Sequence, residues 1–208
     1  MPFFRAVALT CAVAALGGCA GMSEQACLVS DWRTVGFEDG TQGHPVGTIG
    51  SYRQACAKHG VAPDLEAYRA GHAEGVLSYC KPAQGFEVGR RGGGYQGVCP
   101  AELEADFVAA YNSGRHLYEL ESAVARIDSQ IASNLRAQEN IKSELTAIAA
   151  AMVAPETTAE QRVLNVGRAA DLGTRYAELT REIDALRHER VAHEVELREY
   201  RETLALGF

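Results

Sequence analysis

Apolar residues recur at alternating intervals of three and four positions through most of the C-terminal half of the chain. This heptad spacing places them on one stripe of an α-helix, and such a stripe is buried well only against another helix. The first stripe is Leu117, Leu120, Val124, Ile127, Ile131, Asn134, Gln138, Ile141, Leu145, Ile148 and Met152. The second stripe is Leu172, Tyr176, Leu179, Ile183, Leu186, Arg190, His193, Leu197, Tyr200 and Leu204.

The sequence "VAPETTAEQ" separates the two stripes and carries signals for the end of one helix and the start of another. Pro155 ends the first helix, and Thr158 with Gln161 forms a capping box for the second. We therefore predict an antiparallel coiled-coil helical hairpin over residues 115–206, with its turn near 153–158.

The N-terminus has the features of an export signal. Arg5 precedes "AVALTCAVAAL", an apolar run too short to span a bilayer. The following "LGGC" resembles a bacterial lipobox, in which an aliphatic residue stands three positions before a cysteine that becomes lipidated. We predict a lipoprotein signal peptide over 1–18, a lipidated Cys19 and a tether over 19–26. An ordinary cleaved signal is the alternative.

Ala20, rather than an aspartate, follows Cys19, and this favours sorting to the outer membrane over retention in the inner membrane. We expect a lipid-anchored protein of the bacterial cell envelope, at the periplasmic face of the outer membrane. The formal net charge of −7 becomes −8 without residues 1–18, because that segment holds one arginine and no acid. This charge argues against a nucleic-acid partner.

Glycine and cysteine concentrate in one half of the chain. Residues 27–114 hold fifteen glycines, whereas residues 115–208 hold three, so we predict a domain boundary near Gly114. The same half contains Cys27, Cys56, Cys80 and Cys99. An even number of cysteines in an exported protein with a small core predicts two disulfides. The pairing stays open, with a preference for Cys27–Cys56 and Cys80–Cys99.

A zinc site is the alternative for these cysteines, using "CAKH" at Cys56 and His59. The chain lacks paired C-x-x-C spacings, so we predict no metal and no cofactor. The fold class expected is mainly α, with a small disulfide-stabilised, glycine-rich helical domain followed by the long hairpin.

Two helices are predicted within the glycine-rich half, over 51–60 and after the N-cap residue Asp64. Gly71 and Gly75 lie inside the second helix, where each glycine costs about 1 kcal/mol relative to alanine. Close approach of another backbone is the plainest reason for them.

The stretch "GFEVGRRGGGYQGVCP" over 85–100 contains a G-x-G-x-x-G fingerprint of nucleotide-binding loops. No strand long enough precedes it, so we predict only the last loop of the domain, ended by Pro100 at the start of a long helix. Aromatic residues three positions before a glycine, in Tyr68-x-x-Gly71, Phe86-x-x-Gly89 and Tyr111-x-x-Gly114, suggest a repeated packing unit; coincidence of composition is the alternative.

Several spaced motifs of this half agree in order with a known family. They are Cys27-x3-Asp31-Trp32-x3-Gly36-x2-Asp39-Gly40-x2-Gly43, Cys56, Tyr68-x2-Gly71-x3-Gly75-x3-Tyr79-Cys80, and Gly89-Arg90 with Tyr95-x-Gly97-Val98-Cys99-Pro100. Together they resemble the uncharacterised bacterial lipoprotein family called domain of unknown function 2799, over roughly residues 27–114. The resemblance implies an exported, often lipid-anchored cell-envelope protein and carries no assigned activity.

Two further sets of residues suggest chemistry. Asp31, Asp39 and His44 could perform acid–base hydrolysis, but we favour a cap for Asp31, a turn at Asp39-Gly40 and a loop at His44. We therefore predict no catalytic residue. The second set, a glycan-binding surface, would use Trp32, Arg90, Arg91 and Tyr95. A core position is the favoured interpretation of Trp32.

These observations rank the functions. The first is a non-enzymatic, lipid-anchored scaffold that meets a protein partner, or a second copy of itself, through the hairpin. A periplasmic module that binds peptidoglycan or another envelope glycan is the alternative, and a hydrolase comes third.

Lipidation is tested directly at Cys19. We expect the wild-type protein to incorporate a radioactive fatty acid in growing bacteria and the Cys19→Ser variant to lose that label, because the thiol is the acylated group. Equal labelling of the two proteins would rule out lipidation at this residue.

Overall fold

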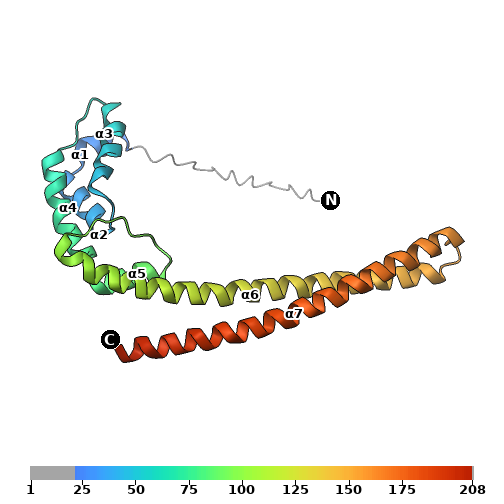
Figure 1. The fold of residues 1–208 in the computed structure, drawn as a ribbon. Helices are drawn as coiled ribbons and strands as arrows, with labels where there is room; N and C mark the ends of the chain where they lie inside the picture. Colours follow the sequence, from blue (N-terminus) through green and yellow to red (C-terminus); the bar gives the residue numbers. More distant parts are fainter. Residues whose placement is uncertain (1–21, 208) are drawn as a thin grey trace, which may run out of the picture. The chain divides into compact units, whose positions relative to one another are not determined.

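The computed structural model describes residues 22–207, so the predicted signal peptide and Cys19 lie outside the described range. Every regular element of the described part is a helix (Figure 1). The elements are α1 (Glu24–Val29), α2 (Trp32–Thr41), the 3-10 turn η1 (Val46–Thr48), α3 (Ile49–Ala57), α4 (Leu65–Tyr79), α5 (Pro82–Arg90), α6 (Ala101–Val153) and α7 (Ala159–Gly207). The prediction of a mainly α protein is confirmed.

The helices form two compact units. The first contains the described residues up to Tyr79 together with Gln96–Cys99, and the second contains Cys80–Tyr95 and the chain from Pro100 onward. The boundary that we expected near Gly114 lies instead inside α6, which continues without a break. Gly114 does not end the helix because it packs against α5.

In the first unit α2 and α4 touch backbone to backbone. A Cβ atom on Gly36 would overlap the carbonyl of Tyr68, and one on Gly75 would overlap the carbonyl of Phe37. Gly71 faces the backbone of Arg33 in the same way. This contact is the close approach that the sequence predicted for the α4 glycines. We call α2 and α4 the first helix pair.

A tight turn ends α2. Gly43 has φ +74°, a conformation that side chains disfavour. The His44 amide donates to the Asp39 carbonyl at 2.9 Å and the Gly43 amide to the Gly40 carbonyl at 3.1 Å, which is a Schellman cap. The prediction that Asp39-Gly40 forms a turn is therefore wrong, because both residues belong to the helix that the turn closes.

In the second unit α5 and α6 repeat this packing, and we call them the second helix pair. Gly85 meets the carbonyl of Phe107, Gly89 meets that of Tyr111, and Gly114 meets that of Phe86. The prediction of a loop over 85–100 is thus wrong for its first part, which is helical through Arg90. Pro82 in the first turn starts α5, and α5 is helical despite its glycines because they allow contact with α6.

The two helix pairs share a sequence register. The segment "GFEDGTQG" at 36–43 corresponds to "GFEVGRRG" at 85–92, and both follow the pattern G-F-E-x-G-x-x-G. In the partner helices, Tyr68, Gly75 and Tyr79 correspond to Phe107, Gly114 and Tyr118. Tyr79 lies against Gly43 as Tyr118 lies against Gly92. A repeated unit therefore exists, although its register differs from the aromatic-to-glycine spacing that suggested it.

Helices α6 and α7 run antiparallel in the second unit (Figure 1). Arg201 pairs with Glu121 at 2.6 Å, and the Gln138 amide donates to the Thr180 hydroxyl at 2.8 Å. Every position of the two apolar stripes is buried or half-buried. The reciprocal capping box predicted for Thr158 and Gln161 is present, with bonds of 2.9 and 3.2 Å.

The base of these helices packs against α5. Leu117, Leu120 and Leu197 form a buried cluster that Phe86 and Tyr200 cover. The Tyr200 hydroxyl also donates to the carbonyl of Ser113 at 2.9 Å. The long helices therefore start from the second helix pair rather than from a separate domain.

The glycine contact gives a stability prediction. Gly75→Ala should lower the free energy of unfolding by about 2–3 kcal/mol, because its Cβ would overlap the backbone of α2. Gly50→Ala in α3 is the matched control: its Cβ meets nothing within 4 Å, so alanine should add about 0.5–1 kcal/mol. Urea unfolding of the lipid-free Cys19→Ser protein measures both. Equal effects of the two changes would contradict the backbone contact.

Candidate functional site

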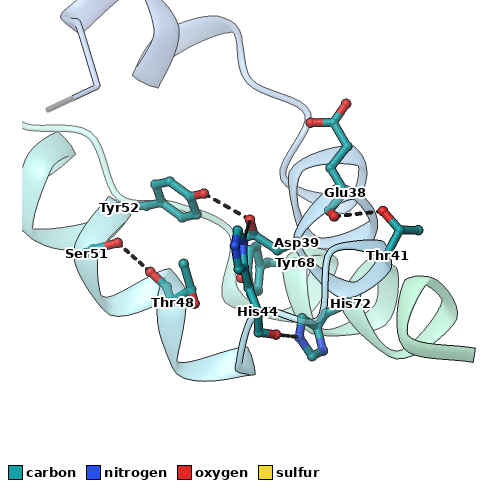
Figure 2. Close-up of polar contacts among 9 residues, drawn as sticks. All are labelled: Glu38, Asp39, Thr41, His44, Thr48, Ser51, Tyr52, Tyr68 and His72. Carbon is teal, nitrogen blue, oxygen red and sulfur yellow. Dashed lines mark hydrogen bonds and ion pairs between the residues drawn. The ribbon is translucent and has the colours of Figure 1, made fainter. Parts of the chain in front are cut away.

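A buried carboxylate occupies the first helix pair. Asp39 is 5% exposed, and its oxygens accept hydrogen bonds from three side chains (Figure 2). The Tyr68 hydroxyl donates to Oδ2 at 2.6 Å, whereas the Tyr52 hydroxyl at 3.2 Å and His44 Nδ1 at 3.1 Å share Oδ1. Three donors offset much of the desolvation that a buried charge costs. We call these four residues the Asp39 site.

Backbone features place these donors. The Schellman turn at Gly43 brings His44 back over the end of α2, so that its ring reaches Asp39. Tyr68 lies in the first turn of α4, fully buried, and Tyr52 comes from α3. His72 Nε2 donates to the carbonyl of His44 at 2.7 Å and so holds the loop from the α4 side.

The hydrogen bond to Asp39 determines the tautomer of His44. An ionised carboxylate can only accept, so Nδ1 of His44 carries the proton and, in the neutral ring, Nε2 is the acceptor. The His44 side chain is 44% exposed. The site therefore offers solvent an imidazole with a fixed orientation, the arrangement that proteins use for proton acceptance and for ligand hydrogen bonding.

The phenols at the site stay protonated over a wide range. Burial, followed by the hydrogen bond to Asp39 and its charge, raises the pKa of Tyr68 well above its ordinary value. Burial and the Asp39 charge likewise raise the pKa of Tyr52. Both hydroxyls therefore remain donors at neutral pH.

An aromatic cluster backs the site. The rings of Trp32 and Tyr52 lie 6.0 Å apart, those of Tyr52 and Tyr68 6.2 Å apart, and Tyr68 stacks on His72 at 6.0 Å. Trp32 is only 8% exposed and belongs to the core with Cys27 and Cys56. Trp32 thus has little surface on which a sugar could stack.

The other predicted residues lie elsewhere. Asp31 caps α2 by accepting from the Arg33 amide and the Thr34 hydroxyl, and the Thr34 bond, then the Arg33 bond, lowers its pKa. It therefore takes no part in the Asp39 site. Arg90 and Arg91 bond to Glu87 in the second unit.

Tyr95 also belongs to the second unit. Its hydroxyl donates to Glu104 at 3.0 Å, and its ring lies 4.9 Å from that of Phe107. Trp32 is in the first unit, so the predicted glycan surface divides between two units.

Sequence reasoning paired Asp39 with His44 but missed Tyr52, Tyr68 and His72. The signal that could have found the site is the comparison of "GFEDGTQG" with "GFEVGRRG", in which the third position after glycine changes from aspartate to valine. A charged residue at a position that is apolar in the related segment is unusual for a helix face that packs on another helix.

The cysteines form disulfides and leave no thiol for zinc. Cys27 and Cys56 are bonded, with their Cα atoms 5.6 Å apart, and Cys80 and Cys99 are also disulfide-bonded. Cys56 is therefore not a ligand beside His59. Residues 22–207 contain no group of three or more His, Cys, Asp or Glu side chains that could hold a metal ion.

The comparison with protein families covers both helix pairs. Residues 31–116 match the family described as Protein of unknown function (DUF2799). This match confirms the resemblance predicted from the spaced motifs. The DUF2799 segment runs from the N-cap of α2 to the part of α6 that contacts α5, and the rest of the long helices extends beyond it.

No curated protein and no solved structure shows significant similarity to the chain. Within the described residues, none of the helices combines the length and the apolar character needed to cross a bilayer. The chemistry of the site therefore rests on its own geometry.

The Tyr68 hydroxyl has a measurable energetic role. Tyr68→Phe should lower the free energy of unfolding at pH 7 by about 1–3 kcal/mol, because Asp39 stays buried and loses its shortest hydrogen bond. Above about pH 10 the unfolded wild type releases the Tyr68 proton while the folded protein keeps it, so wild-type stability falls with pH. The variant lacks this contribution and should lose less stability there. Urea unfolding at pH 8 and pH 10.5 tests both statements, and identical pH slopes would contradict the second.

Proposed function

We propose that this protein is a non-enzymatic, lipid-anchored scaffold of the bacterial cell envelope that binds a protein partner through its helical hairpin. The observation that carries the proposal is an apolar cluster at the turn of the hairpin. Val153, Val163, Leu164 and Val166 are 82%, 72%, 67% and 58% exposed. We call these four residues the tip cluster.

A shallow groove extends the tip cluster. It has a volume of about 260 Å³ and an almost wholly apolar lining formed by Leu145, Ile148, Ala149, Met152, Asn165, Val166 and Ala169. Exposed apolar surface of this kind disfavours the isolated protein by roughly 25 cal/mol per Å² relative to a buried state. A partner helix that places apolar side chains in the groove would remove that cost.

The hairpin also suits a spacing role. α6 has 53 residues and α7 has 49, which at about 1.5 Å per residue gives arms of roughly 75 Å. The heptad stripes and the salt bridges across the arms, such as Arg190 with Asp128, support a coiled-coil pairing of the two helices. Cys19, if acylated, ties the other end of the chain to the periplasmic face of the outer membrane.

Self-association through the same cluster is the second form of this proposal. A two-helix hairpin has one buried seam and gains stability when another helix covers it. The hydrolase remains the third candidate; the paired Asp39 and His44 favour it, whereas no nucleophile is bonded to His44 among the contacts of the site.

Site-specific crosslinking in living cells tests the proposal. A photoreactive residue in place of Leu164 should give an adduct with one envelope protein or with a second copy of the chain. Glu199, an exposed position on the same helix far from the turn, is the matched control and should give none. The Val163→Ser/Val166→Ser change should abolish the adduct without unfolding the protein, since both side chains are exposed. Absence of an adduct at the tip, or equal adducts at both positions, would contradict a tip-mediated partner.

A further inference from the structure

The second helix pair shows what the Asp39 site would be without its polar groups. By the shared register, Asp39 corresponds to Val88, Tyr68 to Phe107, His44 to Gly93 and His72 to Tyr111. Each polar member of the network bonded to Asp39 thus has an apolar or smaller counterpart.

The backbone around these positions is the same. The His44 amide donates to the Asp39 carbonyl at 2.9 Å, and the Gly93 amide donates to the Val88 carbonyl at 2.9 Å. His72 bonds to the carbonyl of His44, as the Tyr111 hydroxyl bonds to the carbonyl of Gly93 at 3.0 Å. Even the flanking ring is matched, because Tyr95 lies on Phe107 as Tyr52 lies on Tyr68.

The glycine-packed fold therefore forms without a carboxylate at this position. A buried carboxylate is expensive unless every donor around it is in place, and apolar residues of similar volume do the same structural work. The second helix pair uses those apolar residues. The polar network of the first pair thus needs a reason other than folding.

We propose that the Asp39 site binds a hydroxyl-bearing ligand of the saccharide class. His44 Nε2 accepts a hydrogen bond from a ligand hydroxyl, and the half-buried Tyr52 ring supplies an apolar edge for the C–H groups of the sugar. Both side chains bond to the same oxygen of Asp39, so a single small ligand reaches both. The partner in this inference is independent of the hairpin.

The composition of the site selects against other ligand classes. The three donors to Asp39 are two phenols and one imidazole, without lysine or arginine, so an anion finds no permanent positive charge. Those same donors occupy the carboxylate, which leaves a metal ion no ligand from it. A neutral ligand rich in hydroxyl groups matches what the site offers.

The second helix pair supplies the variants for the test. Asp39→Val/Tyr68→Phe copies its residues and removes both partners of the buried hydrogen bond, which leaves no unpaired carboxylate. His44→Gly copies Gly93 at an exposed position. Glu38→Gln, one residue from Asp39 and exposed, is the matched control.

The probes are chitotetraose and soluble glycan strands released from purified peptidoglycan, added to the lipid-free Cys19→Ser protein. We expect one or both saccharides to shift the His44 Nε2 resonance in ¹⁵N-detected histidine spectra. Affinity should fall at least about tenfold in His44→Gly and in the double variant and stay unchanged in Glu38→Gln. The double variant should melt within about 5 °C of the parent, a range that corresponds to a small stability change.

Three outcomes would overturn the inference. Neither saccharide shifts His44 Nε2; the shift persists with unchanged affinity in His44→Gly; or the double variant melts far below the parent, which would make the network structural. The His44→Gly result decides the question of binding even if the double variant fails to fold.

Discussion

Direct contact between helix backbones is the constraint on which the DUF2799 segment depends. Where Gly36 and Gly75 bring α2 onto α4, no side chain fits between the helices, so the axis positions and the register are determined together. The same contact between α5 and α6 uses Gly85, Gly89 and Gly114. Glycine is poor in isolated helices, and these helices are therefore stable only as pairs.

Because the glycine contact defines the register, it also positions the polar chemistry. Asp39 precedes Gly40, which packs against α4, so the carboxylate lies at the edge of the helix contact where Tyr68 can reach it. The left-handed turn at Gly43 then returns His44 to the same carboxylate. One backbone geometry thus carries a polar site in the first unit and an apolar core in the second.

The hairpin obeys a different rule. Its stripes bury side chains between helices at a normal separation, and its partners across the arms are ion pairs and amides such as Gln138 with Thr180. The family match ends near the point where α6 leaves α5, so the glycine-packed segment and the long arms are distinct parts of the chain. α6 belongs to both because a helix transmits its register without a linker.

Local patterns in the sequence determined much of this protein. Heptad spacing, the capping box at Thr158 and the breaks at Pro100 and Pro155 act within a few residues, so the two long helices and their turn were predictable. The helix-interior glycines likewise announced a backbone contact, and the cysteine count announced disulfides, with Cys27–Cys56 as the preferred pair.

Only the tertiary structure decided which residues meet. Asp39-Gly40 looks like a turn because those residues favour turns locally, yet packing against α4 keeps them helical. Tyr52 and Tyr68 reach Asp39 from 13 and 29 residues away, distances over which no local propensity acts. The sequence by itself determined the helices and their apolar stripes, whereas the helix contact, which is a property of two backbones together, decided that Asp39 would be buried among three donors.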